Sequence, residues 1–102
     1  MKVIYDDRYK KFVKNLSSLD QGKILRYQDL FSDYGFKLSS KYLKKLDNNL
    51  WELRPGNLRL LVGKVRSLGL TVFVHVFKKK SQKTPKKETK TAQRRLNEYE
   101  KS

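Results

Sequence analysis

Arginine and lysine side chains concentrate in the second half of the chain, where strands and turns are expected to meet. Arg54 and Arg59 flank a Pro-Gly pair, and seven lysines follow between residues 78 and 90, against the single acid Glu88. Guanidinium groups bind phosphate oxygens through paired N–H donors, and lysine adds a compact positive charge. These residue types therefore indicate a ligand that carries phosphate.

The single histidine, His75, has an ordinary pKa near neutrality, so it is a candidate proton acceptor or donor. The alternative interpretation is a half-buried strand histidine with a structural role. One histidine cannot support a two-histidine mechanism, and the absence of cysteine excludes disulfides and Cys-based zinc sites. We therefore expect neither a metal nor a cofactor.

The lysine-rich segment has two interpretations. As a solvated edge it would only add solubility, but beside Arg54 and Arg59 it suits the backbone phosphates of a nucleic acid. Gln82 fits either a base or sugar contact or a structural turn, and Phe77 either stacks on a base or packs in a sheet. The residues that we assign to RNA binding are Lys78, Lys80, Gln82, Lys83, Lys86, Lys87 and Phe77.

The overall charge agrees with a polyanionic partner. The 102 residues include 25 Lys and Arg against 10 Asp and Glu, a net charge of +15, which favours RNA, DNA, an anionic membrane or an acidic protein. No apolar run reaches membrane-spanning length and no hydrophobic segment follows Met1, so we expect a cytoplasmic protein without a membrane partner. This length predicts one domain, residues 1–102, with a basic loop and terminal helix at 78–102.

Hydrophobic periodicity predicts an α+β fold that begins with a strand and a helical hairpin. Residues 2–5 read as the strand, and Asp6 caps a first helix whose inner face carries Tyr9, Phe12, Val13 and Leu16. The second helix runs from about residue 19 to 34 and ends at Gly35. Its expected inward residues are Ile24, Gln28, Leu30, Phe31 and Tyr34. Between residues 36 and 49 we expect a short helical turn with Leu38, Tyr42, Leu43 and Leu46, and then a turn.

The period changes to two after residue 50, which predicts three antiparallel strands at about 51–54, 58–65 and 70–77. Pro55 and Gly56 should take the two central positions of the first turn, and residues 66–69 form the next loop. A final helix from Pro85 to about Tyr99, capped by Thr84, carries an apolar stripe of Ala92, Leu96 and Tyr99. Alternation predicts that the helical hairpin covers Trp51, Leu53, Leu58, Leu60, Val62, Leu70, Val72, Val74 and Val76. It leaves an exposed face of Glu52, Arg54, Arg59, Leu61, Thr71, Phe73, His75 and Phe77.

This order of elements resembles the RelE/ParE superfamily of type II toxins, and most closely its HigB-like, phage Gp49-like branch. The resemblance rests on Leu50-Trp51-Glu52-Leu53-Arg54, on Arg59, on His75-Val76-Phe77-Lys78-Lys79-Lys80-Ser81-Gln82-Lys83-Thr84-Pro85, and on Ala92 and Arg95. It implies a microbial-ribonuclease-like sheet packed against helices. It also implies a metal-independent, ribosome-dependent endoribonuclease that cleaves mRNA in the A site and inhibits translation.

The resemblance implies partners and site residues as well. The cognate antitoxin would be a HigA-like helix-turn-helix protein, and the complex of the two would bind operator DNA. Arg59 matches the arginine that contacts the scissile phosphate, Arg54 matches the arginine that ends the preceding strand, and Lys78, Lys79 and Lys80 fall where catalytic or rRNA-binding residues lie. The candidate catalytic set is Arg54, Arg59, His75 and Lys79.

The match to the family is incomplete at several positions. Glu52 stands where RelE has a catalytic lysine, the C-terminal tyrosine of RelE sites has no clear counterpart, and Ser81 replaces a frequent threonine. Arg59 also has a structural interpretation as the partner of Glu52. Two other functions agree with the sequence, a ParE-like gyrase poison and a non-catalytic module that binds RNA or an acidic protein. We expect an antitoxin with acidic residues opposite Lys78 to Lys90. The proton-transfer groups and the codon preference are not determined by the sequence.

Overall fold

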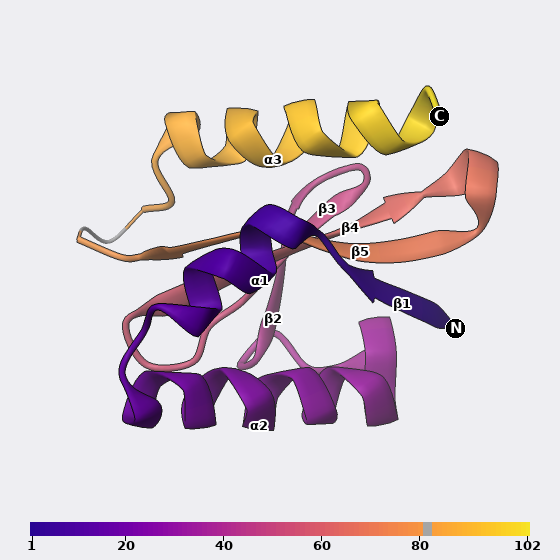
Figure 1. Ribbon diagram of the computed structural model, residues 1–102. Coiled ribbons are helices and arrows are strands. Elements are labelled where there is room, and N and C mark those ends of the chain that lie inside the picture. Colours follow the sequence, from indigo (N-terminus) through magenta and orange to yellow (C-terminus); the bar gives the residue numbers. More distant parts are fainter. Residues whose placement is uncertain (81–82) are drawn as a thin grey trace.

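The computed structural model describes residues 1–80 and 83–102 of the chain. Within these residues, five strands form one sheet in the order β1-β5-β4-β3-β2, with α3 on one face and α1 and α2 on the other (Figure 1). The elements are β1 (Lys2–Tyr5), α1 (Asp7–Lys14), α2 (Ser18–Tyr34), β2 (Leu43–Asp47), β3 (Leu50–Leu53), β4 (Leu58–Val65), β5 (Leu70–Lys78) and α3 (Lys86–Glu100), with 3-10 turns at Gly35–Lys37 and Arg66–Leu68. The predicted α+β class is confirmed. β1 pairs with β5 in parallel, and the other pairs are antiparallel.

The helical hairpin forms where the sequence predicts it. The Asp6 side chain accepts a hydrogen bond from the backbone N–H of Arg8, at 2.8 Å, and thereby caps α1. Gly35, with φ of 59°, ends α2. Ile24 and Phe31 are fully buried, but Phe12 and Tyr34, which we predicted to face inward, are 41% and 60% exposed. Tyr34 is the last residue of α2, where the chain turns at Gly35, so its ring lies outside the core.

The predicted helical turn before residue 47 is wrong, because Leu43–Asp47 form the edge strand β2. Leu43 and Leu46 are three residues apart. That spacing places two side chains on one face of a helix but on opposite faces of a strand. Leu43 packs in the cluster under α2 and Leu46 packs against the cluster under α3. Both sides of the sheet are covered, so the two leucines are accommodated by a strand.

The predicted alternation along β5 is also partly wrong, because the strand contains a β-bulge. Leu61 pairs with His75 and Val62 pairs with Phe73, which leaves Val74 without a partner on β4. Before the bulge, Phe73 therefore faces α2 and Val72 faces α3, the reverse of the prediction. After it, Val76 returns to the α2 side as predicted. Leu70 and Val74 likewise belong to the α3 side.

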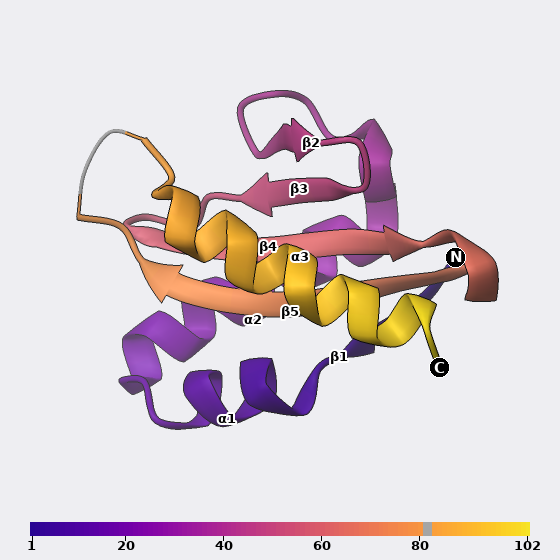
Figure 2. The same cartoon turned by 90° about the horizontal axis from the view of Figure 1, so that it is seen from above.

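Helix α3 covers the sheet face that the sequence analysis left exposed (Figure 2). Ala92 and Leu96, from the predicted apolar stripe, are buried there, and Tyr99 packs beside them. Gly63 permits this contact, because a Cβ atom at this position would collide with Leu96 and lie 2.9 Å from the backbone oxygen of Asn49. Polar residues on this face are thus enclosed between the sheet and a helix.

The start of α3 differs by one position from the prediction. Pro85 is the N-cap and Lys86 is the first helical residue, and the cap has no side-chain hydrogen bond. Thr84, the predicted cap, instead donates a hydrogen bond from Oγ1 to Glu52 Oε1, at 2.8 Å. None of the helices in the described part of the chain is long and apolar enough to cross a membrane.

Candidate nucleic-acid interface

Three segments meet at one end of the sheet: the β3–β4 turn, the end of β5 and the first turns of α2 (Figures 1 and 2). The backbone N–H of Lys79 donates to Asn57 O at 2.6 Å, which ties the end of β5 to the turn. Lys23 of α2 reaches the same turn. Its Nζ lies 3.5 Å from the position that a Cβ atom on Gly56 would occupy. We call this region, with Lys23, Arg54, Arg59, Lys78 and Lys79, the basic edge.

The turn at the basic edge is shifted by one residue from the predicted register. Leu58 N–H donates to Pro55 O at 2.9 Å, so Gly56, with φ of 59°, takes the first central position instead of the second. A positive φ there favours glycine. The shift turns the Gly56 carbonyl toward Arg59, whose Nη1 donates to it at 2.9 Å.

Arg59 lies on β4 and is 6% exposed, so its predicted position on an exposed sheet face is wrong. Its Nε lies 3.3 Å from Glu52 Oε1, and its Nη1 also donates to Leu58 O at 2.6 Å. Among the described residues, nothing accepts a hydrogen bond from Nη2. That nitrogen is therefore the part of the guanidinium that these contacts leave unengaged.

Burial and neighbouring charges act on the pKa of Arg59 in opposite directions. Burial lowers the pKa of the Arg59 guanidinium, Glu52 raises it, and the neighbouring positive charge of Arg54 lowers it again. An arginine pKa lowered in this way still leaves the group protonated at neutral pH. Arg59 and the charge of Arg54 that acts on it thus face a single buried carboxylate, which leaves a surplus of positive charge.

Glu52 holds the interior of this arrangement together. It is 2% exposed, and its Oε1 forms an ion pair with Arg59 and accepts a hydrogen bond from Thr84. Thr84 lies just before α3, so the carboxylate connects β3, β4 and the segment that leads into the helix. Both interpretations of Arg59 thus concern the same place: the pair with Glu52 exists, and it fixes the arginine at the basic edge.

His75 is enclosed under α3. Arg95 Nη1 lies 3.3 Å from His75 Nδ1, and His75 Nε2 lies 2.8 Å from Glu88 Oε1. Because a guanidinium can only donate, Nδ1 must accept, which places the proton on Nε2 and makes Glu88 its acceptor. Burial lowers the pKa of His75, and although the hydrogen bond to Glu88 raises it, the net shift is downward. The imidazole is thus a neutral tautomer with both nitrogens engaged.

The remaining residues assigned to RNA binding are spread along the edge and the start of α3. Lys78 is exposed, with Nζ 3.7 Å from Asp20 Oδ2, and Lys80, Lys83, Lys86 and Lys87 are exposed as well. Phe77 is 5% exposed and packs in the cluster under α3, with its ring 5.7 Å from that of His75. Gln82, together with Ser81, lies outside the described residues.

Lys23 and Tyr27 belong to this region but were missed by the sequence analysis. They are four residues apart on α2 and therefore share one face of that helix. Their position could have been inferred from Ile24 and Phe31. Those two residues are buried and mark the side of α2 that meets the sheet, and Lys23 and Tyr27 lie close to them in sequence. Only the placement of the β3–β4 turn beside α2 makes these side chains neighbours of Arg59.

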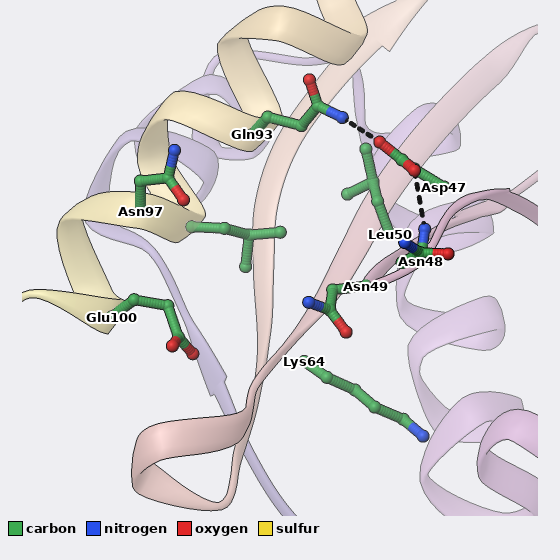
Figure 3. Close-up of a pocket in the computed structure, with 9 residues that line it drawn as sticks. Asp47, Asn48, Asn49, Leu50, Lys64, Gln93, Asn97 and Glu100 are labelled. Atoms are coloured by element: carbon green, nitrogen blue, oxygen red, sulfur yellow. Dashed lines mark hydrogen bonds between the residues drawn. The ribbon is translucent and has the colours of Figure 1, made fainter.

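A separate hollow of about 330 Å³ lies between α3 and the β2–β3 turn. Figure 3 shows Gln93 of α3 bonded to Asp47, and the ammonium end of Lys64 pointing away from α3. The hollow is lined mainly by amide and carboxylate side chains, and none of the predicted site residues lines it. It is therefore not part of the basic edge.

Comparison with known proteins gives a family and a fold. Residues 11–97 match the family model described as Phage derived protein Gp49-like (DUF891). Among solved structures, the chain is similar to a chain of the archaeal RelE–RelB complex from Pyrococcus horikoshii OT3, with a TM-score of 0.60 and 14% identity, covering 80% of this chain and 97% of that one. At this identity the likeness shows the fold alone, which is RelE-like. No curated protein matches the chain.

Proposed function

This chain belongs to the Phage derived protein Gp49-like family, and from that membership together with its RelE-like fold we propose that it is the toxin of a type II toxin–antitoxin pair. We further propose that it acts as a ribosome-dependent endoribonuclease on mRNA. The observation that carries this proposal is the basic edge, where Arg59 pairs with the buried carboxylate Glu52 and Lys23 and the Lys79 backbone meet the same tight turn.

Cleavage of RNA through its 2′-hydroxyl places extra negative charge on a pentavalent phosphate. Positive groups that are already oriented stabilise this charge at no cost of reorganisation. Arg59 fits that task, because Glu52 and the carbonyls of Gly56 and Leu58 hold two of the three nitrogens of its guanidinium. We assign Arg59 to the phosphate, Arg54 and Lys79 to charge stabilisation beside it, and Glu52 to the positioning of Arg59.

The lysines that lead from Lys78, at the basic edge, into α3 have a different role in this proposal. Lys78, Lys80, Lys83, Lys86 and Lys87 are exposed and follow one another from the end of β5 into α3. Such a row binds backbone phosphates without sequence preference. We assign it to the ribosome and the mRNA, and we propose that the antitoxin presents acidic residues to it.

Mapping of mRNA 5′ ends after induction of the chain in a bacterium tests the proposal. Wild type should yield cleavage at positions fixed relative to the codon, and Arg54→Ala with Lys79→Ala should reduce it about 100-fold, the typical cost of lost charge stabilisation. A second variant, Arg59→Lys, keeps the charge beside Glu52 but removes the planar fork. It should reduce cleavage while the protein stays folded.

The matched control is Arg94→Ala with Lys101→Ala, which removes the same charges from exposed positions near the end of α3. This variant should cleave like wild type. Equal cleavage by the basic-edge variant and this control would contradict the site assignment. Cleavage of free mRNA without ribosomes would contradict ribosome dependence, and DNA damage without any mRNA cleavage would indicate a gyrase poison instead.

A further inference from the structure

A second group of cations and aromatic rings lies away from the basic edge, on the α2 side of the sheet. Lys45 of β2 and Lys64 of β4 approach the same Trp51 ring on β3, with their Nζ atoms 5.6 and 5.2 Å from its centroid. Lys64 also lies over the Phe36 ring, at 4.4 Å, and the two rings are 4.5 Å apart. We call Phe36, Lys45, Trp51 and Lys64 the Trp51 row.

The Trp51 row is connected to the basic edge by two more rings. Leu43, at the start of β2, pairs with Leu53 at the end of β3, so this end of β2 lies next to the strand end that leads to Arg54. Tyr42, just before β2, carries Lys41 over its ring at 5.5 Å and lies 6.0 Å from Tyr27. Tyr27 lies one turn of α2 from Lys23, which reaches the turn whose Gly56 carbonyl accepts a hydrogen bond from Arg59. The side chains of Tyr27, Lys41 and Tyr42 therefore lie between the basic edge and the Trp51 row.

The positive charges of Lys41, Lys45 and Lys64 are only partly offset by neighbouring carboxylates. Within the described residues, none of Lys41, Lys45 and Lys64 forms an ion pair. Asp29 and Asp33 share a hollow with Lys41 and Arg26, which balances that end. At the Trp51 row, two ammonium groups flank one ring from neighbouring strands. Lys64 also lines a hollow with Asp47 and Glu100, but its ammonium end points away from α3 (Figure 3). The rings hold the lysines in place through cation–π contacts, so a bound phosphate meets cations that are already ordered.

We propose that the surface from Tyr27 and Tyr42 to the Trp51 row binds single-stranded RNA, as a continuation of the strand whose phosphate reaches Arg59. The proposal rests on the proposed function, since it extends the path of the same RNA. Single-stranded RNA carries spaced phosphates that the lysines can bind. Its unpaired bases can also stack on the aromatic rings in place of a lysine. A duplex would present phosphates alone.

The fluorescence of Trp51, the single tryptophan of the chain, reports directly on this surface. The probe is a ten-nucleotide uridine RNA with 2′-O-methyl groups, which cannot be cleaved through its 2′ oxygens, titrated into the full chain. We expect saturable, salt-dependent quenching of the Trp51 emission. A ten-base-pair RNA duplex should quench less at equal concentration.

Lys45→Gln with Lys64→Gln should weaken binding roughly 10- to 30-fold at 0.1 M salt, and should lower the slope of log K against log salt by about 1.4, because each single-strand phosphate contact contributes about 0.7. Binding of the variants is measured by anisotropy of a dye on the RNA, since these substitutions alter the tryptophan environment. The matched control is Lys2→Gln with Lys11→Gln, two exposed lysines on β1 and α1. Lys45→Arg with Lys64→Arg retains charge and ring contact and should bind like wild type.

Three results would overturn the proposal: no quenching of wild type, equal loss of affinity in the Gln pair and its control, or stronger quenching by the duplex. Self-association of the Gln pair without weaker RNA binding would also overturn it, because the lysines would then only protect the edge strand. Failure of the proposed function is a separate outcome. A chain that never cleaves mRNA but shows the expected quenching retains the RNA surface and loses the nuclease assignment.

Discussion

Two networks that contain a buried carboxylate and an arginine lie at the two ends of α3, and they differ in how completely the arginine is paired. At one end, Arg8 donates to both Asp6 oxygens, at 2.9 and 2.8 Å, and to Glu98 Oε1 at 2.8 Å. Tyr99 of α3 adds a hydrogen bond to Asp6 at 2.9 Å. At the other end, Arg59 has one carboxylate, Glu52, at 3.3 Å, and further cations close by.

This difference separates a structural contact from the binding site that we propose. Two carboxylates saturate Arg8, so the Asp6 network holds α3 against the start of α1 and offers nothing to a ligand. Burial would raise the pKa of Asp6, but hydrogen bonds from Arg8 and Tyr99 outweigh it and lower that pKa to about 2. Around Glu52 the cations outnumber the carboxylate, so the same chemical groups leave a place for an anion.

The largest effect on stability is expected from Glu52→Ala. Removing this carboxylate leaves Arg59 buried without a charged partner, which should cost about 3–5 kcal/mol in the free energy of unfolding. Glu98→Ala is the counterpart in the other network, and because Glu98 is exposed we expect no measurable change. Urea unfolding of both variants checks this, and similar losses in the two would remove the contrast between the networks.

The next effect concerns the docking of α3, on which both networks depend. Gly63→Ala places a methyl group against Leu96 and 2.9 Å from the Asn49 backbone oxygen. Overpacking of this kind should cost about 1–3 kcal/mol. Amide hydrogen exchange should then show faster exchange along α3 while the hydrogen bonds between β4 and β5 stay protected. Uniform loss of protection across the sheet would mean that α3 is not a separable layer.

A smaller loss, about 0.5–2 kcal/mol, is expected for Asp6→Ala at neutral pH, because the α1 cap is lost. The pH dependence sharpens the comparison. Since the folded pKa of Asp6 is lowered from 3.8 to about 2, its contribution is present above pH 3.8 and is lost as the pH falls toward 2. In Asp6→Asn, the free energy of unfolding should depend less on pH over that range. A profile equal to that of wild type would show that the carboxylate charge is not used.

The smallest effect concerns His75. Its pKa is lowered by burial in the folded state, so below the ordinary histidine value of about 6.5 the unfolded chain binds more protons. The free energy of unfolding should therefore fall as the pH decreases below about 6.5. In His75→Gln it should fall less over that range. Urea unfolding at several pH values between 5 and 7.5 measures the difference. A wild type that becomes more stable on acidification in this range would contradict the neutral tautomer.

The sequence was sufficient for features that depend on near neighbours along the chain. The cap at Asp6, the end of α2 at Gly35 and the apolar stripe of α3 follow from spacing and from residue type. The turn at Pro55 and Gly56 was predicted as well, but its register is shifted by one residue. The strand β2 was missed because leucines three residues apart suit a helix with one buried face as well as a strand with two. The bulge at Val74 was invisible because nothing in the residue types of β5 marks it.

What the sequence determined by itself is the chemistry of the chain: its excess of cations, its resemblance to a toxin family and the α+β order of its elements. What only the tertiary structure decided is which charges are satisfied. Arg8 lies in the first turn of α1 and Arg59 follows the β3–β4 turn, and each has a carboxylate within a few residues along the chain or the sheet. Contacts between residues distant in sequence, Arg8 with Glu98 and Glu52 with Thr84, complete one network and leave cations in excess at the other. Pairing depends on the distances that packing imposes, and those distances arise only when α3 lies on the sheet.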